Sequence, residues 1–141
     1  MDKKFHIAIA VSDIEATVQE YSRRLGAAPV LVVTDEYALW RTTTLNFSIR
    51  KTKDAAGTVR HVGWEDPAAT GFTRETDANG LLWERFTEQD QQEEITRLWP
   101  TAIAQQAITN PLTKKEHLWR RQNSNTGVQS STQKMPVSFL T

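Results

Sequence analysis

Two of the three histidines in this 141-residue chain occupy matching positions in two similar segments. His6 is the second residue of the run FHIAIAVSD, and His61 is the second residue of RHVGWED; both runs look like strands that end in an acidic turn. Glu84 lies in the middle of a third apolar run, LLWERF. Two imidazoles and one carboxylate on separate strands are the donors of an open divalent-metal site. The sequence therefore predicts such a site, with coordination positions left for water or substrate oxygens.

Each of these residues alone has a simpler explanation. A single histidine in a strand is more typical of an ordinary surface or partly buried side chain, so the prediction depends on the three residues together. Glu84 alternates with Leu82 and Phe86, which would make it a buried charge, and a buried charge needs a partner. A metal ion and an arginine are the two alternatives for that partner.

Composition limits the classes of protein that the chain can belong to. A hydrophobic content of 38% suffices for one modest core. The net charge is zero and the pI is near 6.8, which gives no sign of a nucleic-acid or acidic-membrane surface. The absence of cysteine excludes disulfides, thiolate ligands and cysteine nucleophiles. No signal peptide or membrane-spanning run is visible, so we expect a cytoplasmic protein that binds neither nucleic acid nor membrane.

The first half of the chain predicts the order strand–helix–strand–strand–strand. The helix is expected to follow an N-cap at Ser12 and to end at Gly26. In the last strand Asn46, Ser48 and Arg50 share the polar face. The predicted strands are residues 5–11, 30–33, 37–41 and 44–51.

The second half begins with a similar strand, but the chain that follows is too short to repeat the same order of elements. Residues 66–79 cannot hold a helix and two strands, and Asn79-Gly80 predicts a tight turn before the last strand. Either the sheet is incomplete, or another chain supplies the missing wall. We therefore divide the chain into a domain at 1–87 (modules 4–52 and 58–87), a helical appendage at 88–122, and a polar, disordered tail at 123–141.

This order of motifs resembles the vicinal oxygen chelate superfamily, which includes glyoxalase I, extradiol dioxygenases, and the fosfomycin- and bleomycin-resistance proteins. The matching text is HIAIAVSD with Tyr21 and Leu25-Gly26, then HVG from His61, then DANGLLWE ending at Glu84. The resemblance covers residues 5–87. It implies an α+β fold, a cup of βαβββ modules, here with a truncated second module and a helical C-terminal appendage.

The resemblance also implies roles for particular residues. His6, His61 and Glu84 map to the metal ligands of the superfamily. This set of two imidazoles and one carboxylate suits iron, zinc, nickel, manganese or cobalt. Several members take a further ligand from the fourth strand of the first module, where this chain offers only Asn46 or Ser48. The missing carboxylate argues against a four-ligand lyase site of the glyoxalase I kind.

Arginines are the candidates for binding an anionic substrate. Arg41, Arg50 and Arg85 all lie in predicted strands, and Arg50 is the best of them because it shares a strand face with Asn46 and Ser48. We therefore predict Arg50, Asn46 and Ser48 as substrate-binding residues. The five tryptophans could line the pocket, but such residues are more typical of a core or an interface.

Two functions of different class follow. The first is a metal-dependent lyase or dioxygenase that acts on a small oxygen-rich substrate. The second is a non-catalytic member of the same fold, which binds a small molecule, as bleomycin-resistance proteins do, or binds a protein partner. Because a truncated sheet leaves open edges that are normally covered or paired, we also expect a homodimer.

Overall fold

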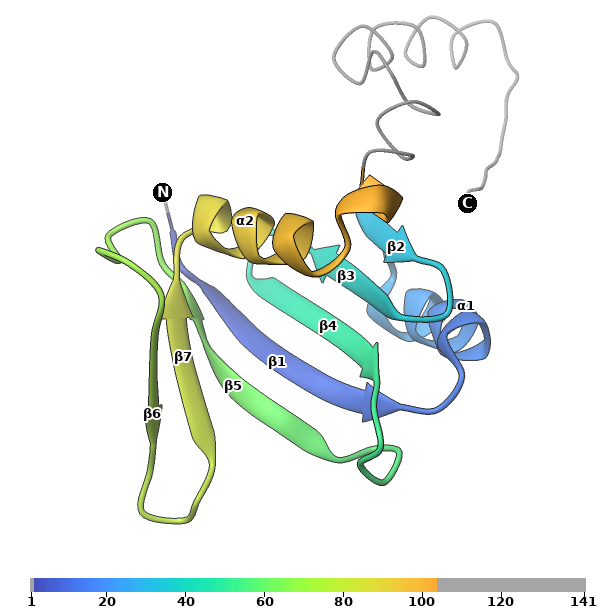
Figure 1. Ribbon diagram of the computed structural model, residues 1–141, viewed down its shortest axis with the longest axis horizontal. Helices are drawn as coiled ribbons and strands as arrows, with labels where there is room; N and C mark the ends of the chain where they lie inside the picture. The colour runs from blue at the N-terminus through green and yellow to red at the C-terminus, as the bar shows by residue number, and fades with distance from the viewer. Residues whose placement is uncertain (1, 104–141) are drawn as a thin grey trace, which may run out of the picture. The chain divides into compact units, whose positions relative to one another are not determined.

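Seven strands form one mixed sheet in the order β2-β3-β4-β1-β5-β7-β6, which makes the fold α+β (Figure 1). This computed structural model describes residues 2–103, and Met1–Pro100 forms one compact unit. The predicted segments beyond residue 103, including the end of the 88–122 appendage and the 123–141 tail, lie outside the described residues. The strands are β1 (Lys4–Val11), β2 (Leu31–Val33), β3 (Tyr37–Arg41), β4 (Leu45–Lys51), β5 (Val59–Glu65), β6 (Thr73–Thr76) and β7 (Leu82–Phe86); the helices are α1 (Ile14–Leu25) and α2 (Glu88–Leu98).

The two halves of the sheet repeat one pairing pattern. In the first half β1 pairs in parallel with β4, and β4 pairs with the antiparallel strand β3. In the second half β5 pairs in parallel with β7, and β7 pairs with the antiparallel strand β6. An antiparallel pairing of β1 with β5 joins the halves. Between β5 and β6 the chain has no counterpart of α1 or β2.

Strand β6 was not predicted. Its four residues, Thr73–Thr76, are all exposed and lack the alternation of apolar and polar side chains that marks a half-buried strand. It forms because β7 offers an unpaired edge, and the turn at Asp77–Gly80 reverses the chain onto that edge. The strand conformation of β6 is therefore determined by its pairing with β7 and not by an alternating pattern in its own sequence.

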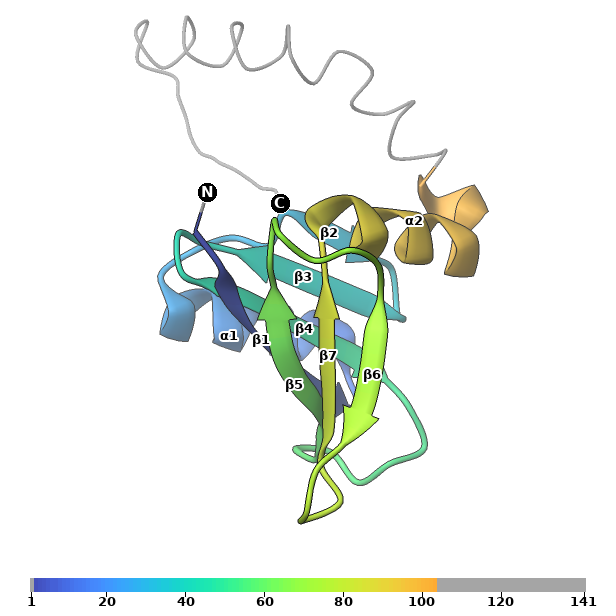
Figure 2. The same ribbon diagram turned by 90° about the vertical axis from the view of Figure 1, so that its left-hand side faces the viewer.

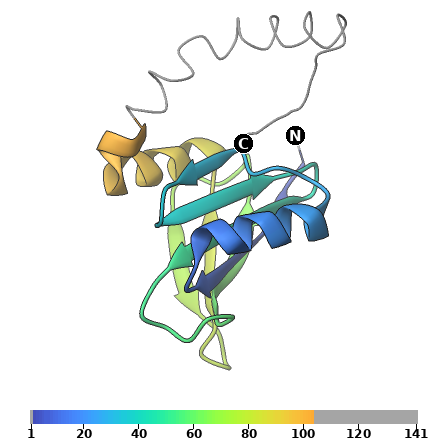
Figure 3. The same cartoon turned by 90° about the vertical axis from the view of Figure 1, so that its right-hand side faces the viewer.

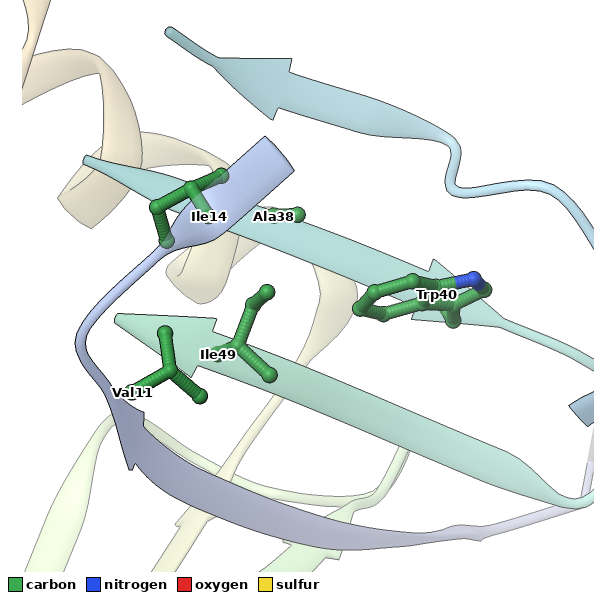
Figure 4. Packing of buried hydrophobic residues seen from close by; sticks show 5 residues of the cluster. All are labelled: Val11, Ile14, Ala38, Trp40 and Ile49. Carbon is green, nitrogen blue, oxygen red and sulfur yellow. The ribbon is translucent and has the colours of Figure 1, made fainter. Parts of the chain in front are cut away.

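The hydrophobic core lies on the face of the sheet that α1 covers (Figures 3 and 4). Trp40 and Ile49 have no exposed surface, and the Trp40 indole N–H donates to the backbone oxygen of Ala27 at 3.0 Å. Full burial of one such side chain contributes about 1.5–3 kcal/mol. The buried members of this cluster are Val11, Ile14, Ala38, Trp40 and Ile49.

The ends of α1 differ partly from expectation. The N-cap is Asp13 and not Ser12, because the Asp13 carboxylate accepts a hydrogen bond from the Ala16 amide at 3.0 Å. Ser12 lies one residue too early for its side chain to reach that amide. Gly26 ends the helix as predicted, in a left-handed conformation with φ of 69°.

The opposite face of the sheet carries the polar side chains and is covered in part by α2. A capping box between Thr87 and Asp90 begins this helix, and Gln91 and Ile95 are its buried residues. Figure 2 shows how the sheet curves between β3–β4 and β5–β7–β6, with α2 along one end of the curve. The first part of the predicted appendage therefore packs on the sheet. Neither of these two helices has the length and apolar character needed to cross a lipid bilayer.

Candidate metal and ligand site

The structure brings together the three predicted metal ligands. His6 lies on β1, His61 on β5 and Glu84 on β7, and one ligand atom from each lies within 4.8 Å of the others. The Oε1 atom of Glu84 is 3.2 Å from His61 Nε2 and 3.9 Å from His6 Nε2. Glu84 and His6 are buried, and the side chain of His61 is 13% exposed. This is an open group of three donors at the edge of a cavity.

Gly63 makes this approach possible. In the sheet register it lies between His6 on one side and Glu84 on the other. A Cβ atom at this position would lie 1.8 Å from the backbone oxygen of Glu84, closer than any real contact. A glycine is therefore required for β7 to lie this close to β5, and the separation of the three ligands depends on it.

The tautomer of His6 follows from its hydrogen bonds. Its Nδ1 atom lies 2.9 Å from Asn46 Oδ1 and 3.1 Å from the backbone oxygen of Asn46. Both atoms are acceptors, so Nδ1 must carry the hydrogen. Burial lowers the pKa of His6, which favours the neutral ring. A neutral ring with hydrogen on Nδ1 presents a lone pair at Nε2, the atom that faces Glu84.

A chain of charged and polar groups orients Asn46 in turn. Its amide nitrogen donates to Glu65 Oε1 and to Gln91 Oε1, each at 2.8 Å. Arg41 donates to both carboxylate oxygens of Glu65, at 3.0 and 2.7 Å. Burial alone would raise the pKa of Glu65, but the hydrogen bonds from Arg41 and Asn46 more than offset this and lower it. The ionised Glu65 therefore fixes which end of the Asn46 amide faces His6.

Arg74 is the cation that accompanies Glu84. Its Nε atom donates to Glu84 Oε2 at 3.0 Å, and its second nitrogen donates to Glu94 Oε2 at 3.0 Å. Burial raises the pKa of Glu84, and the charge of Arg74 opposes that change. For His61, burial and the neighbouring His6 lower the pKa to about 3. Both imidazoles are therefore neutral near pH 7 and available as ligands.

The three ligands open into a cavity of about 270 Å³ between the sheet and α2. Such a volume suits a compact molecule, because pockets for drug-sized ligands are usually larger. The cavity is lined by residues of six strands and of α2. They include His6, His61, Glu84, Tyr37, Ser48, Arg50, Arg60, Arg74, Glu94, Phe72, Phe86, Leu82, Gln91, Ile95, Leu98 and Trp99.

The predicted substrate-binding residues are separated by the structure. Arg50 and Ser48 line the cavity. Asn46 does not, because it is fully buried behind His6 and contacts that ring. The other arginine candidates are engaged elsewhere: Arg41 binds Glu65, and Arg85 binds Asp66 at 2.8 Å. Asn46 is thus an orienting residue in this structure.

Sequence reasoning missed Arg60, although it is adjacent to His61. Strict alternation along β5 would direct these two side chains to opposite faces. The register of β5 against β1 shifts between Ala8 and Ile9, whose partners are His61 and Val59. Arg60 is therefore the extra residue of a β-bulge, and both Arg60 and His61 line the cavity. Nothing in the sequence marks this bulge.

Most of the described tryptophans pack in the core or against other aromatic rings and do not line the cavity. Trp40 lies in the core, and Trp64 and Trp83 pack around Phe5, with ring centroids 5.1 and 6.4 Å away. Trp99 alone among the described tryptophans lines the cavity. Trp119 lies outside the described residues. The indole of Trp99 packs against Tyr37 at 4.9 Å between ring centroids.

Comparisons with known proteins leave the chain without an assigned family. No family model matches it, and no curated protein matches it. Among solved structures, it is similar to a chain from Legionella pneumophila described as an NAD-dependent benzaldehyde dehydrogenase. That likeness has 9% identity and a TM-score of 0.43, and covers 59% of this chain and 97% of the other. A likeness this weak carries no argument about fold or function.

Proposed function

We propose that this protein binds a divalent metal ion through His6, His61 and Glu84 and uses it in an enzymatic reaction on a small, oxygen-rich molecule. One observation carries the proposal. The lone pair of His6 Nε2 and a carboxylate oxygen of Glu84 face each other in a buried place, and no hydrogen of the neutral His6 ring lies between them. A cation at this point satisfies both atoms.

The donor set fits a metal of the kind predicted. Two neutral imidazoles and one carboxylate suit iron, zinc, nickel, manganese or cobalt. When bound, such an ion supplies Lewis-acid activation of a coordinated oxygen, or a place where substrate and dioxygen meet. The protein's own part is to hold His6 by Asn46, and to neutralise the second oxygen of Glu84 with Arg74. Leu98 and Trp99, at the end of α2, line one wall of the cavity.

The repeated strand pairing supports a further proposal, that the sheet is a vicinal-oxygen-chelate-like cup with a complete and a truncated module. The pairing of β1, β4 and β3 recurs in β5, β7 and β6, and the cavity is lined from both halves. The homodimer remains a prediction. The sheet ends at β2 and β6 in the described part of the chain, and the exposed strand β6 is the edge that a second copy would cover.

A second candidate function is a metal-independent binding protein. What favours it is the scarcity of acid–base groups around the cavity. Besides the three proposed ligands and the arginines, Glu94 and Tyr37 are the titratable groups of the described lining. Glu94 is bound to Arg74, and burial raises the pKa of Tyr37 above its ordinary value. A cavity with this lining could bind a ligand without transforming it.

Metal analysis decides between the two. We expect untagged protein to contain close to one iron, zinc, nickel, manganese or cobalt ion per chain by plasma mass spectrometry. A His6→Ala/His61→Ala double variant should contain none. The third histidine of the chain offers a matched control, so His117→Ala should retain the ion. A parent protein that stays metal-free after incubation with excess divalent ions and dialysis would overturn the enzyme proposal and support the binding protein.

A further inference from the structure

Two arginines in the cavity have no anionic partner. Arg50 on β4 and Arg60 on β5 both line it, and neither has a carboxylate within ion-pair distance in the described part of the chain. The other arginine of the cavity, Arg74, is engaged with both Glu84 and Glu94. Arg74 brings one positive charge to these two carboxylates, so the charged side chains of the lining keep a net positive charge. Asp54 and Glu84 act on Arg60 only from beyond ion-pair distance, and the N–H donors of Arg50 and Arg60 are left for another acceptor.

Placing two unpaired guanidinium groups near each other is unfavourable unless something offsets it. Each loses hydration on the cavity wall, where Arg60 is only partly exposed, and the two like charges repel. The arrangement is also specific, because Arg60 reaches this face only through the β-bulge in β5. Bulges of this kind commonly re-aim a side chain toward a functional site.

The contacts of Arg50 leave its hydrogen-bond donors available. Its guanidinium lies over the Trp99 ring, with the central carbon 5.1 Å from the ring centroid. Stacking on an aromatic face orients the planar guanidinium while its N–H groups, which lie in the plane, stay free. Neighbouring hydroxyl groups of Tyr37 and Ser48 add polar partners on the same wall.

We propose that Arg50 and Arg60 form an anion subsite, which binds the carboxylate or phosphonate group of a compact substrate whose other oxygens reach the His6–His61–Glu84 centre. This deepens the proposed function and rests on it for the second contact of the substrate. Planar guanidinium groups pair with either type of oxyanion in a bidentate manner. The cavity of about 270 Å³ limits the ligand to a small molecule.

The test separates this subsite from the metal. Methylphosphonate and acetate, each a bare anionic group, are titrated calorimetrically into metal-free protein at low ionic strength. We expect one site per chain, and at least about tenfold weaker binding in Arg60→Met and in Arg50→Met, since loss of a charge-assisted hydrogen bond costs roughly that factor. Arg23→Met removes an exposed arginine on α1 and serves as the control, with affinity unchanged within about twofold.

The two anions distinguish the two kinds of substrate. Tighter binding of methylphosphonate would assign a phosphonate or phosphate, and equal or tighter binding of acetate would assign a carboxylate. Arg60→Lys keeps the charge without the planar group, and we expect it to bind with intermediate affinity. Thermal melting of every variant shows that it is folded. Because Arg50 and Arg60 lie on different strands, one folded variant suffices for the test.

Failure of this inference differs from failure of the metal proposal. If neither anion binds, or if Arg60→Met and Arg50→Met bind as tightly as Arg23→Met, the anion subsite is overturned whatever the metal content. If anions bind through these arginines but the parent protein takes up no metal, the subsite stands and the metal-dependent function fails. Metal uptake by Arg60→Met is expected to be no weaker than that of the parent, because removal of the Arg60 charge lessens the repulsion of a cation at the three ligands.

Discussion

The complete half of the sheet, β1 to β4 with α1, contrasts with the shortened half, β5 to β7. The first half buries a continuous apolar cluster around Trp40 and Ile49 beneath its helix. The second half has no helix of its own, and its outer strand β6 is exposed along its whole length. Yet the second half supplies His61 and Glu84, two of the three proposed ligands, together with Arg60 and Arg74.

This difference indicates a division between stability and chemistry. The chain has no helix between β5 and β7, and this half carries the charged side chains Arg60, Arg74 and Glu84 on its cavity face. Glu65 of the second half pairs with Arg41 and Asn46 of the first half across the seam between β1 and β5, whereas Arg74 pairs with Glu84 in its own half and with Glu94 on α2. The first half therefore acts as the scaffold. A ligand that binds at the seam between β1 and β5 can change the stability of the second half.

The largest loss of stability is expected from the core of the complete half. Trp40→Ala removes a side chain with no exposed surface, and we expect a loss of about 3–5 kcal/mol in the free energy of unfolding. Urea denaturation measures it. Trp83→Ala removes a half-buried tryptophan of the shortened half, and we expect a clearly smaller loss. Equal losses would contradict the division between the halves.

The next largest effect is expected at the seam. Asn46→Ala leaves the buried Gln91 amide without its Asn46 partners and removes one of two partners each from His6 Nδ1 and Glu65 Oε1, and we expect a loss of about 2–3 kcal/mol. Metal affinity should fall about 10- to 100-fold, as is typical when an orienting partner of a ligand is removed. Ser48→Ala is the control, because Ser48 lies on the same strand face and the hydrogen bonds of His6 go to Asn46 and not to Ser48. A metal affinity unchanged in Asn46→Ala would show that Asn46 does not orient His6.

A methyl group at position 63 tests the spacing of the ligands. Gly63→Ala places a Cβ against the backbone of Glu84, and we expect β7 to move away at a cost of about 1–3 kcal/mol. Metal uptake should fall while the first half remains folded, which near-ultraviolet circular dichroism of Trp40 follows. Gly57→Ala offers a comparison at a loop glycine that has open space around it but a φ of 93°, so it should lose stability through backbone strain and keep the metal. Retention of full metal uptake in Gly63→Ala would argue against a strict spacing requirement.

The smallest effect is expected at the exposed edge of the shortened half. The Arg74 side chain is 47% exposed, so its ion pair with Glu84 is screened by solvent, and Arg74→Met should cost no more than about 1 kcal/mol. The loss should be smaller in metal-loaded protein than in metal-free protein, because a bound ion takes over the compensation of Glu84. Thermal melting with and without metal measures both values. A larger loss in the loaded protein would contradict a metal ion at Glu84.

The sequence predicted well those elements that are set by alternation of apolar and polar residues or by a helix-ending glycine. Period-two patterns located β1 and β4 and their two faces, and Gly26 located the end of α1. Matching positions in two similar segments singled out His6 and His61. What it could not provide depends on pairing between strands: the bulge at Arg60, and the strand β6, which exists only because β7 has an edge. The role of Asn46 also required knowing that β4 lies beside β1.

The ligands of the proposed metal site come from the first, fifth and seventh strands, and Gln91 of α2 joins the hydrogen bonds behind them. Contacts between residues so distant in the chain form late in folding, after the costs of closing long loops are met. An ion that binds there recognises only the finished unit. Metal should therefore slow unfolding while leaving the refolding rate unchanged, and the lifetime of the native state will depend on how fast the ion leaves.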